Sequence, residues 1–277
     1  MRDTTDLLNE LVAMSHWLGD PARDLVILGE GNTSARVDEH SFFVKASGMT
    51  LREIEPDGFV EIAFAPMLEF LDHGDPSDEA TTEALMAARV DPTVPFGQAQ
   101  DKPLRPSVET PLHALALVVG GAKFVGHTHP TAVNAILCSR RAEEAIAGRL
   151  FPDEIVVCGP APAYVPYTDP GLPLARKVWE VLETHIETYG EPPKVILMQN
   201  HGLIALGQSP REVQNITAMY VKTARILLGA YALGGPRFMT PDDVARIHTR
   251  PDEAYRRREL VHHGGNPSVV TGQAPVE

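Results

Sequence analysis

The sequence predicts an α/β protein in which helices pack against a central β-sheet. From residue 107 onward, apolar segments of strand length alternate with segments of helical periodicity, a pattern typical of α/β layers around one sheet. The first third instead combines one amphipathic segment with short extended segments and turns, which indicates a helix packed on antiparallel strands. We interpret residues 1–277 as a single domain, although this length also allows two small ones.

The opening third is predicted to contain one helix and four strands. Apolar residues recur at roughly helical spacing over residues 4–18, which predicts the helix. A turn containing two glycines, residues 29–32, separates the first two strands. The predicted strands occupy residues 25–28, 33–37, 42–46 and 59–62.

Residues 72–106 form the irregular part of the chain. They contain a predicted helix, residues 78–89, followed by a proline-containing loop and a polar run that ends at Pro106. No second region of core size is set apart by this segment. We therefore interpret it as an excursion at the rim of the domain, such as a lid or an oligomer contact.

The remainder of the chain predicts alternating helices and strands. The predicted helices occupy residues 108–119, 131–137, 173–188 and 212–233. The predicted strands occupy residues 124–127, 154–158, 195–198 and 203–206. Thr240 and Arg250 are each followed by proline and two acidic residues, which suits the first turn of a helix. We expect a C-terminal helical extension from about residue 236 and disorder from Gly264.

Composition excludes several classes of function. The net charge is −13, and such an acidic surface repels nucleic acid, although a small phosphorylated substrate can still bind in a pocket. No run approaches the ~18 apolar residues of a membrane span, and the N-terminus lacks the pattern of a signal peptide. The two cysteines form no CxxC motif. These features together favour a cytoplasmic protein without a membrane or nucleic-acid partner.

Three histidines follow two of the predicted strands. His127 and His129 lie two residues apart at the end of an apolar strand, so both imidazoles can face one point. A His-x-His pair alone is a weak signal of metal binding. His201 also lies at a strand end, in Gln199-Asn200-His201-Gly202, and would supply the third nitrogen of a catalytic metal site. A lone histidine at such a position is more often structural.

Glu109 is the candidate acid/base. It follows Ser107, which could cap the next helix, and so would lie in the first helical turn as an ordinary dipole-favoured acid. The functional interpretation is a carboxylate directed into the site beside a Lewis-acidic metal. His113, four residues further on, shares a helical face with Glu109 and could support it or be purely structural.

Two turns offer small residues and hydrogen-bond donors. Gly31-Asn32-Thr33-Ser34 and Lys45-Ala46-Ser47-Gly48 could cradle a phosphate on their N–H groups and hydroxyls, although each is ordinary by itself. Lys45 could also act as a Schiff-base lysine, but a metal site would make that mechanism redundant.

These motifs together resemble the class II aldolase/adducin family, which includes fuculose- and rhamnulose-phosphate aldolases. The resemblance runs from about residue 6 to about residue 233 and is greatest to the aldolase part of two-domain rhamnulose-phosphate aldolase/dehydrogenase proteins. Val165-Pro166-Tyr167 and Pro170-Gly171 also resemble a family segment. The motifs that carry the resemblance, in the family's order, are those containing Asn32, Ser47, Glu109, His127 with His129, and His201.

The resemblance implies a fold and a set of roles. The fold would be a three-layer αβα sandwich with a mixed, largely antiparallel sheet, in a homotetramer with active sites between subunits. A divalent metal, zinc or else manganese, cobalt or another ion, would be held by His127, His129 and His201. Glu109 would be the catalytic acid/base, and Tyr255 of a neighbouring subunit a second acid. The substrate phosphate would be held by Gly31, Asn32, Ser47, Gly48 and Ser107.

Val108 departs from the family pattern. Many family aldolases carry a second serine at this position, and its hydroxyl contacts the phosphate. Loss of a charge-assisted hydrogen bond of ~1.5–3 kcal/mol would weaken phosphate binding about tenfold or more. The substrate would then carry its phosphate differently or lack one.

The implied activity is cleavage of a ketose 1-phosphate, or a related hydroxyketone, to dihydroxyacetone phosphate and an aldehyde through a metal-stabilised enediolate. A sugar-phosphate 4-epimerase or a keto-acid phosphate decarboxylase would use the same enediolate chemistry. Epimerase relatives tend to carry aspartate where this chain has Glu109, which favours the aldolase. An adducin-like interaction module is disfavoured, because such modules lack the three histidines.

Overall fold

A seven-stranded mixed sheet organises the computed structural model, which describes residues 3–72, 74, 76–91 and 104–253. The strand order is β3-β2-β1-β4-β7-β6-β5. Every neighbouring pair is antiparallel except β5 and β6, which are parallel. The strands are β1 (Asn32–Arg36), β2 (Ser41–Lys45), β3 (Phe59–Ala63), β4 (Phe124–Thr128), β5 (Ala163–Val165), β6 (Val195–Met198) and β7 (Gly202–Gly207).

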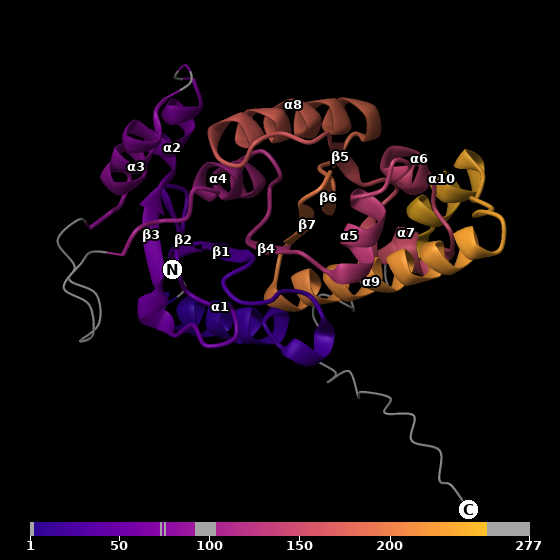
Figure 1. Cartoon of the computed structure of the whole chain (residues 1–277), viewed down its shortest axis with the longest axis horizontal. Helices are drawn as coiled ribbons and strands as arrows, with labels where there is room; N and C mark the ends of the chain where they lie inside the picture. The colour runs from indigo at the N-terminus through magenta and orange to yellow at the C-terminus, as the bar shows by residue number, and fades with distance from the viewer. Residues whose placement is uncertain (1–2, 73, 75, 92–103, 254–277) are drawn as a thin grey trace, which may run out of the picture.

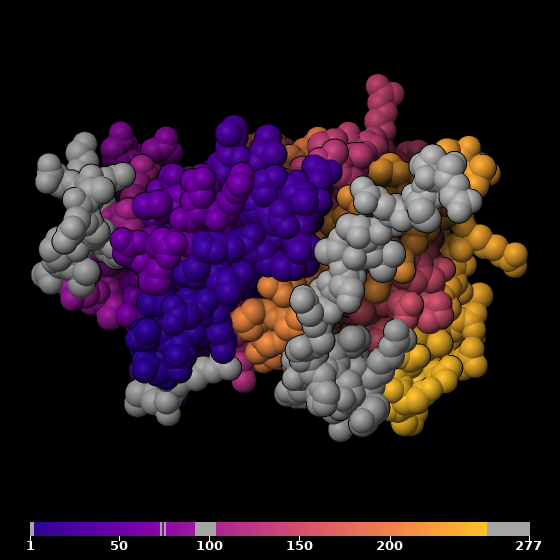
Figure 2. Space-filling view, turned by 90° about the horizontal axis from the view of Figure 1, so that it is seen from below, coloured from indigo at the N-terminus to yellow at the C-terminus, as the bar shows by residue number. Residues whose placement is uncertain are grey.

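Helices cover both faces of the sheet (Figure 1). Helices α1 (Thr4–Leu18) and α9 (Pro210–Ala232) lie on one face, and α4 (Thr110–Val118) and α8 (Leu172–Tyr189) lie on the other. Figure 2 views the first of these faces, where the indigo N-terminal segment covers the sheet and yellow α10 (Pro241–Thr249) lies at one end. The predicted three-layer αβα sandwich is therefore confirmed.

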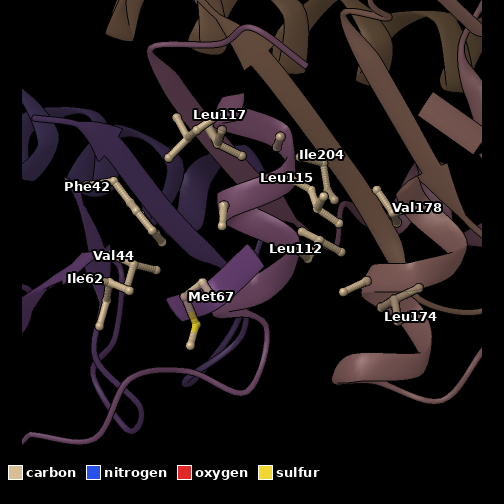
Figure 3. Packing of buried hydrophobic residues seen from close by; sticks show 14 of the residues in the cluster. Phe42, Val44, Ile62, Met67, Leu112, Leu115, Leu117, Leu174, Val178 and Ile204 are labelled. Carbon is tan, nitrogen blue, oxygen red and sulfur yellow. The ribbon is translucent and has the colours of Figure 1, made fainter. Parts of the chain in front are cut away.

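The strand period of two separates the core into two layers. Ile196 and Met198 of β6 pack with the leucines of α4 and α8, whereas Val195 and Leu197 pack with those of α1 and α9. Figure 3 shows the first layer, in which Leu115 of α4 lies beside Ile204 of β7. Each such fully buried aliphatic side chain contributes about 1.5–3 kcal/mol, so these layers hold the helices against the sheet.

The shorter helices gather at the two ends of the sheet (Figure 1). Helices α2 (Phe64–Leu71) and α3 (Asp78–Ala87) lie beside β3. At the other end are α5 (Thr131–Leu137), α6 (Ala142–Ile146), α7 (Pro152–Cys158) and α10. No helix among the described residues is long and apolar enough to cross a membrane.

The strand predicted at residues 25–28 is wrong. This segment is a turn in which Leu28 has a φ of 51°, in the left-handed region, and Ile27 and Leu28 are exposed. Its apolar residues predicted a strand, but only Leu25 and Val26 turn toward the core.

The strand predicted at residues 154–158 is also wrong, because the segment belongs to helix α7. Pro152 occupies the first helical position and Asp153 lies in the first turn, both of which favour a helix start. The side chain of Glu154 also accepts a hydrogen bond from the N–H of Leu150 at 2.8 Å, which links the helix to the residues before it. Strand β5 and helix α2 were not predicted.

The predicted helix of the rim segment is present as α3. The predicted C-terminal helix starts are also present, since α10 begins at Pro241 and residues 251–253 are helical. The loop at 92–103, Tyr255 and the tail from Gly264 lie outside the described residues. The assignment of the whole chain to one domain stays a prediction.

Candidate metal centre

The candidate site lies at the edge of the sheet where three strands end. Strand β7 is antiparallel to both β4 and β6, so β4 and β6 run in the same direction, and β5 is parallel to β6. Their carboxyl ends therefore meet at one edge. His127 belongs to the end of β4, His129 follows it, and His201 follows β6.

The three predicted ligands are brought together. Their candidate ligand atoms all lie within 4.8 Å of one another. Nε2 of His129 is 3.0 Å from Nε2 of His127, and the ring of His201 lies edge-on to both, at centroid distances of 5.0 and 5.1 Å. No other such group of potential metal ligands occurs in the described part of the chain.

Backbone contacts orient the first histidine. Nδ1 of His127 lies 3.1 Å from the carbonyl oxygen of Leu203 on the neighbouring strand β7. Because a carbonyl only accepts, Nδ1 carries the proton and Nε2 keeps its lone pair for a ligand.

Glycine is required at two positions around these rings. A Cβ at Gly202 would lie 2.6 Å from the carbonyl oxygen of Thr128 and 2.7 Å from Cδ2 of His129. Gly31 has a φ of 73°, and a Cβ there would lie 2.6 Å from the carbonyl oxygen of His127. The backbone of two neighbouring segments therefore approaches the histidines too closely for any larger residue.

Glu109 faces the same cluster. Its Oε1 lies 3.2 Å from Nε2 of His201, and its Oε2 lies 3.6 Å from Nε2 of His127. The side-chain amide of Asn32 donates a hydrogen bond to Oε2. Glu109 is 8% exposed, so it is not the surface acid of the alternative interpretation.

The helix start near Glu109 differs from the prediction. Helix α4 begins at Thr110, and Glu109 occupies the position before it, with a φ of −89° and a ψ of 4°. The hydroxyl of Ser107 accepts a hydrogen bond from the N–H of Glu109 at 3.3 Å, while Thr110 bonds the carbonyl of Ser107. These bonds turn the Glu109 side chain away from the helix surface and into the site.

Burial and neighbouring charges together determine which groups of the cluster are ionised. It lowers the pKa of His127 to about 3 and also lowers the pKa of His129, so both rings are neutral near pH 7 and able to bind a metal. Burial raises the pKa of Glu109, but His127 and His201 lower it by more, so the carboxylate is ionised.

Two further polar residues are buried close to Glu109. Nδ1 of His113 lies 2.7 Å from Oγ of Ser34, and burial lowers the pKa of His113 to about 4. Nζ of Lys45 donates to the carbonyl oxygen of Met49 at 2.7 Å. Burial lowers the pKa of Lys45 to about 8, an effect that the charge of Glu109 partly offsets.

The residues fit a divalent cation. In a tetrahedral zinc site with Zn–N distances of 2.0–2.1 Å, two nitrogens lie about 3.3 Å apart, close to the 3.0 Å between Nε2 of His127 and Nε2 of His129. Three imidazoles and a nearby carboxylate form a donor set typical of catalytic zinc, with a position left for substrate.

The predicted phosphate residues lie on three segments: Gly31 and Asn32 at the start of β1, Ser47 and Gly48 in the turn after β2, and Ser107 before α4. The N–H of Ser47 donates to the carbonyl oxygen of Arg105 at 2.8 Å, which brings the turn after β2 beside Ser107. Ser47 and Gly48 are exposed, whereas Asn32 and Ser107 are buried. The role of these positions in phosphate binding stays a prediction.

Glu30 is a residue of this region that the sequence did not reveal. Its Oε1 lies 3.7 Å from Nδ1 of His129. A glutamate between two turn glycines carries no periodic or motif signal, so only the fold brings it to the site.

Sequence and structure comparisons find relatives of this chain. The Bacillus subtilis protein described as "Uncharacterized oxidoreductase YuxG" is 26% identical over 225 residues, which cover 78% of this chain but only 29% of that protein. The methylthioribulose-1-phosphate dehydratase of Microcystis aeruginosa is 24% identical over 213 residues, which cover 73% of this chain and 85% of that protein. A solved L-fuculose 1-phosphate aldolase shares the fold with a TM-score of 0.64 at 17% identity, covering 92% of this chain and 98% of that one.

The family profile described as "Class II Aldolase and Adducin N-terminal domain" matches residues 9–228. This range includes Glu109 and all three histidines of the cluster. The protein therefore belongs to the class II aldolase and adducin family.

Proposed function

We propose that the protein is a metal-dependent aldolase that cleaves a ketose 1-phosphate, or a related hydroxyketone, to dihydroxyacetone phosphate and an aldehyde. The observation that carries this proposal is the carboxylate of Glu109, buried within 3.2 Å of His201 and 3.6 Å of His127. A buried base beside three convergent imidazoles suits proton transfer at a carbon next to a carbonyl. Membership of the family supports the same chemistry.

The cation would be held by His127, His129 and His201. Zinc matches the nitrogen donors best, and manganese or cobalt are the alternatives. When bound, the cation supplies Lewis-acid stabilisation of the negative charge that develops on the substrate oxygens.

Glu109 performs the proton transfer at carbon. In the condensation direction its carboxylate removes a proton from the carbon beside the carbonyl of dihydroxyacetone phosphate, and the electron pair forms the bond to the aldehyde carbon. In cleavage the substrate hydroxyl gives its proton to a second acid/base group, the carbon–carbon bond breaks with its electron pair left on the three-carbon fragment, and the protonated form of Glu109 gives its proton to that carbon. The lowered pKa of Glu109 favours its basic form, and the Asn32 amide fixes one oxygen.

A second acid must protonate the aldehyde oxygen during condensation. We assign this role to Tyr255 of a neighbouring subunit in a cytoplasmic homotetramer, following the family resemblance. The phosphate would bind through Gly31, Asn32, Ser47, Gly48 and Ser107.

Dehydration is the second candidate, favoured by the similarity to methylthioribulose-1-phosphate dehydratase over 85% of that protein. It would begin with the same proton removal by Glu109 and then expel a hydroxyl group as water, with no carbon–carbon cleavage. Epimerisation and decarboxylation would also begin at this site, whereas an interaction module would need neither Glu109 nor a metal.

The test is a panel of ketose 1-phosphates and their unphosphorylated ketoses, incubated with metal-loaded protein. We expect release of dihydroxyacetone phosphate or dihydroxyacetone, lost on chelation and in His129→Ala and Glu109→Ala. Loss of water without cleavage would replace the aldolase by the dehydratase. A metal-loaded protein that changes no substrate on the panel would contradict both.

A further inference from the structure

A second carboxylate lies beside the histidine cluster, next to His129. Oε1 of Glu30 lies 3.7 Å from Nδ1 of His129, while Nε2 of the same ring faces His127 at 3.0 Å. The two nitrogens of His129 are thus divided between an acidic partner and the cluster. The Glu30 side chain is 37% exposed and that of His129 is 19% exposed.

A tight turn holds the Glu30 carboxylate in place. Its Oε2 accepts a hydrogen bond from the N–H of Ile27 at 3.0 Å, and the N–H of Glu30 donates to the carbonyl of Ile27 at 3.0 Å. Between them Leu28 adopts a φ of 51°, which costs a non-glycine residue about 1–2 kcal/mol. Leu28 is also 84% exposed, so core packing does not explain this strained conformation.

The ring of His129 is confined from its other side. Cδ2 of His129 lies 2.7 Å from the point where a Cβ at Gly202 would stand. The N–H of His129 also donates to the carbonyl of Leu25 at 2.8 Å, which anchors its backbone to the segment that leads into the Glu30 turn. A cavity of about 450 Å³ borders both Glu30 and His129.

We propose that Glu30 is a positioning residue for the metal ligand His129. Its carboxylate, 3.7 Å from Nδ1, attracts the Nδ1–H of the imidazole, favours the tautomer in which Nε2 carries the lone pair, and directs Nε2 toward the site formed with His127 and His201. A carboxylate partner also makes the imidazole a stronger donor. The backbone carbonyl of Leu203, 3.1 Å from Nδ1 of His127, orients that ring in a similar way. Two of the three ligands therefore have an acceptor facing the nitrogen that points away from the metal. This inference rests on the metal site of the proposed function.

Metal affinity, measured by competition with a chromophoric chelator for Zn²⁺ and Co²⁺, tests the proposal without any substrate. Loss of such a partner typically lowers metal affinity about 10- to 100-fold, and we expect this for Glu30→Ala with one metal still bound per chain. Glu30→Gln keeps an acceptor oxygen but no charge, so its loss should be smaller. The visible spectrum of the Co²⁺ protein should change in Glu30→Ala, because the His129 ring is no longer fixed.

Asp24→Asn is the matched control. Asp24 borders the same cavity, but its Oδ1 accepts from the hydroxyl of Thr131 at 2.7 Å, and its φ of 57° suits asparagine well. The variant makes the same carboxylate-to-amide change without touching His129, so its metal affinity should equal that of the unmodified protein.

Several outcomes would overturn the assignment. Unchanged affinity in Glu30→Ala would make Glu30 a surface acid, and equal losses in Asp24→Asn and Glu30→Gln would indicate only the general charge of the cavity. Complete loss of metal in Glu30→Ala, as expected for His129→Ala, would make Glu30 a ligand. If the unmodified protein binds no metal, both the proposed function and the role of Glu30 are wrong. If it binds metal normally but cleaves no ketose, the aldolase proposal fails and the role of Glu30 stands.

Discussion

The amide of Asn32 donates a hydrogen bond to the carboxylate of Glu109, although 77 positions separate the two residues in the sequence. Asn32 begins β1 directly opposite His127 of β4, while Glu109 precedes α4, which lies on one face of the sheet. The strand register therefore places the amide at the carboxylate. One oxygen of Glu109 is engaged by Asn32, and the other faces His201.

Asn32→Ala should reduce turnover. A hydrogen bond to a charged group is worth about 1.5–3 kcal/mol, so kcat should fall about tenfold or more if that bond orients the base. Steady-state kinetics would measure this loss, with exposed Asn9→Ala as the control. An unchanged kcat would show that Asn32 serves another purpose.

Gly202→Ala should disrupt the histidine cluster. The added Cβ would meet the carbonyl oxygen of Thr128 and the ring of His129 at distances that no real Cβ tolerates. We expect a lower melting temperature and weaker metal binding, measured by thermal denaturation with and without Zn²⁺. Gly229→Ala is the control, because its Cβ meets nothing within 4 Å on helix α9, where alanine should stabilise by about 1 kcal/mol. Wild-type metal affinity in Gly202→Ala would contradict the close packing.

His113 should make stability depend on pH. Its pKa is lowered by burial to about 4, so the folded chain keeps it neutral where the unfolded chain, with an ordinary value near 6.5, takes up a proton. The unfolded state therefore binds more protons between these values, and stability falls as pH falls. This residue should lower the free energy of unfolding by about 2 kcal/mol as the pH falls from 7 to 5. Urea denaturation should show a smaller loss over this range for His113→Gln, and an equal loss would contradict the assignment.

The sequence predicted those parts of the fold that periodicity and end signals both specify. The helix at residues 4–18 and the strand at residues 195–198 were predicted with the bounds they have, because one has a clear amphipathic pattern and the other is a short apolar run between polar ends. The run at residues 154–158 was misassigned because a short apolar run fits either a strand or a buried helix. The proline and acids at its start were the better signal.

The convergence of the candidate site was only partly predictable. His127 and His129 could be paired from strand geometry, and His201 from its position at a strand end. The neighbours of these residues depend on strand order, which local patterns do not encode. Glu30 reaches His129 only because the segment predicted as a strand at residues 25–28 is a turn, and the Asn32–Glu109 bond follows from the pairing of β1 with β4.

Val108→Ser should reveal whether the substrate carries a phosphate at the predicted site. Val108 is 41% exposed and lies between Ser107 and Glu109, so the substitution leaves the core intact and adds a hydroxyl beside the predicted phosphate loops. One added hydrogen bond to a charged group should lower KM for a phosphorylated ketose about tenfold and leave KM for the unphosphorylated ketose unchanged. Ser107→Ala should act in the opposite direction on the phosphorylated substrate alone. Equal changes for both substrates would mean that no phosphate binds there, because a neutral ligand and an anion could not gain equally from the same donor.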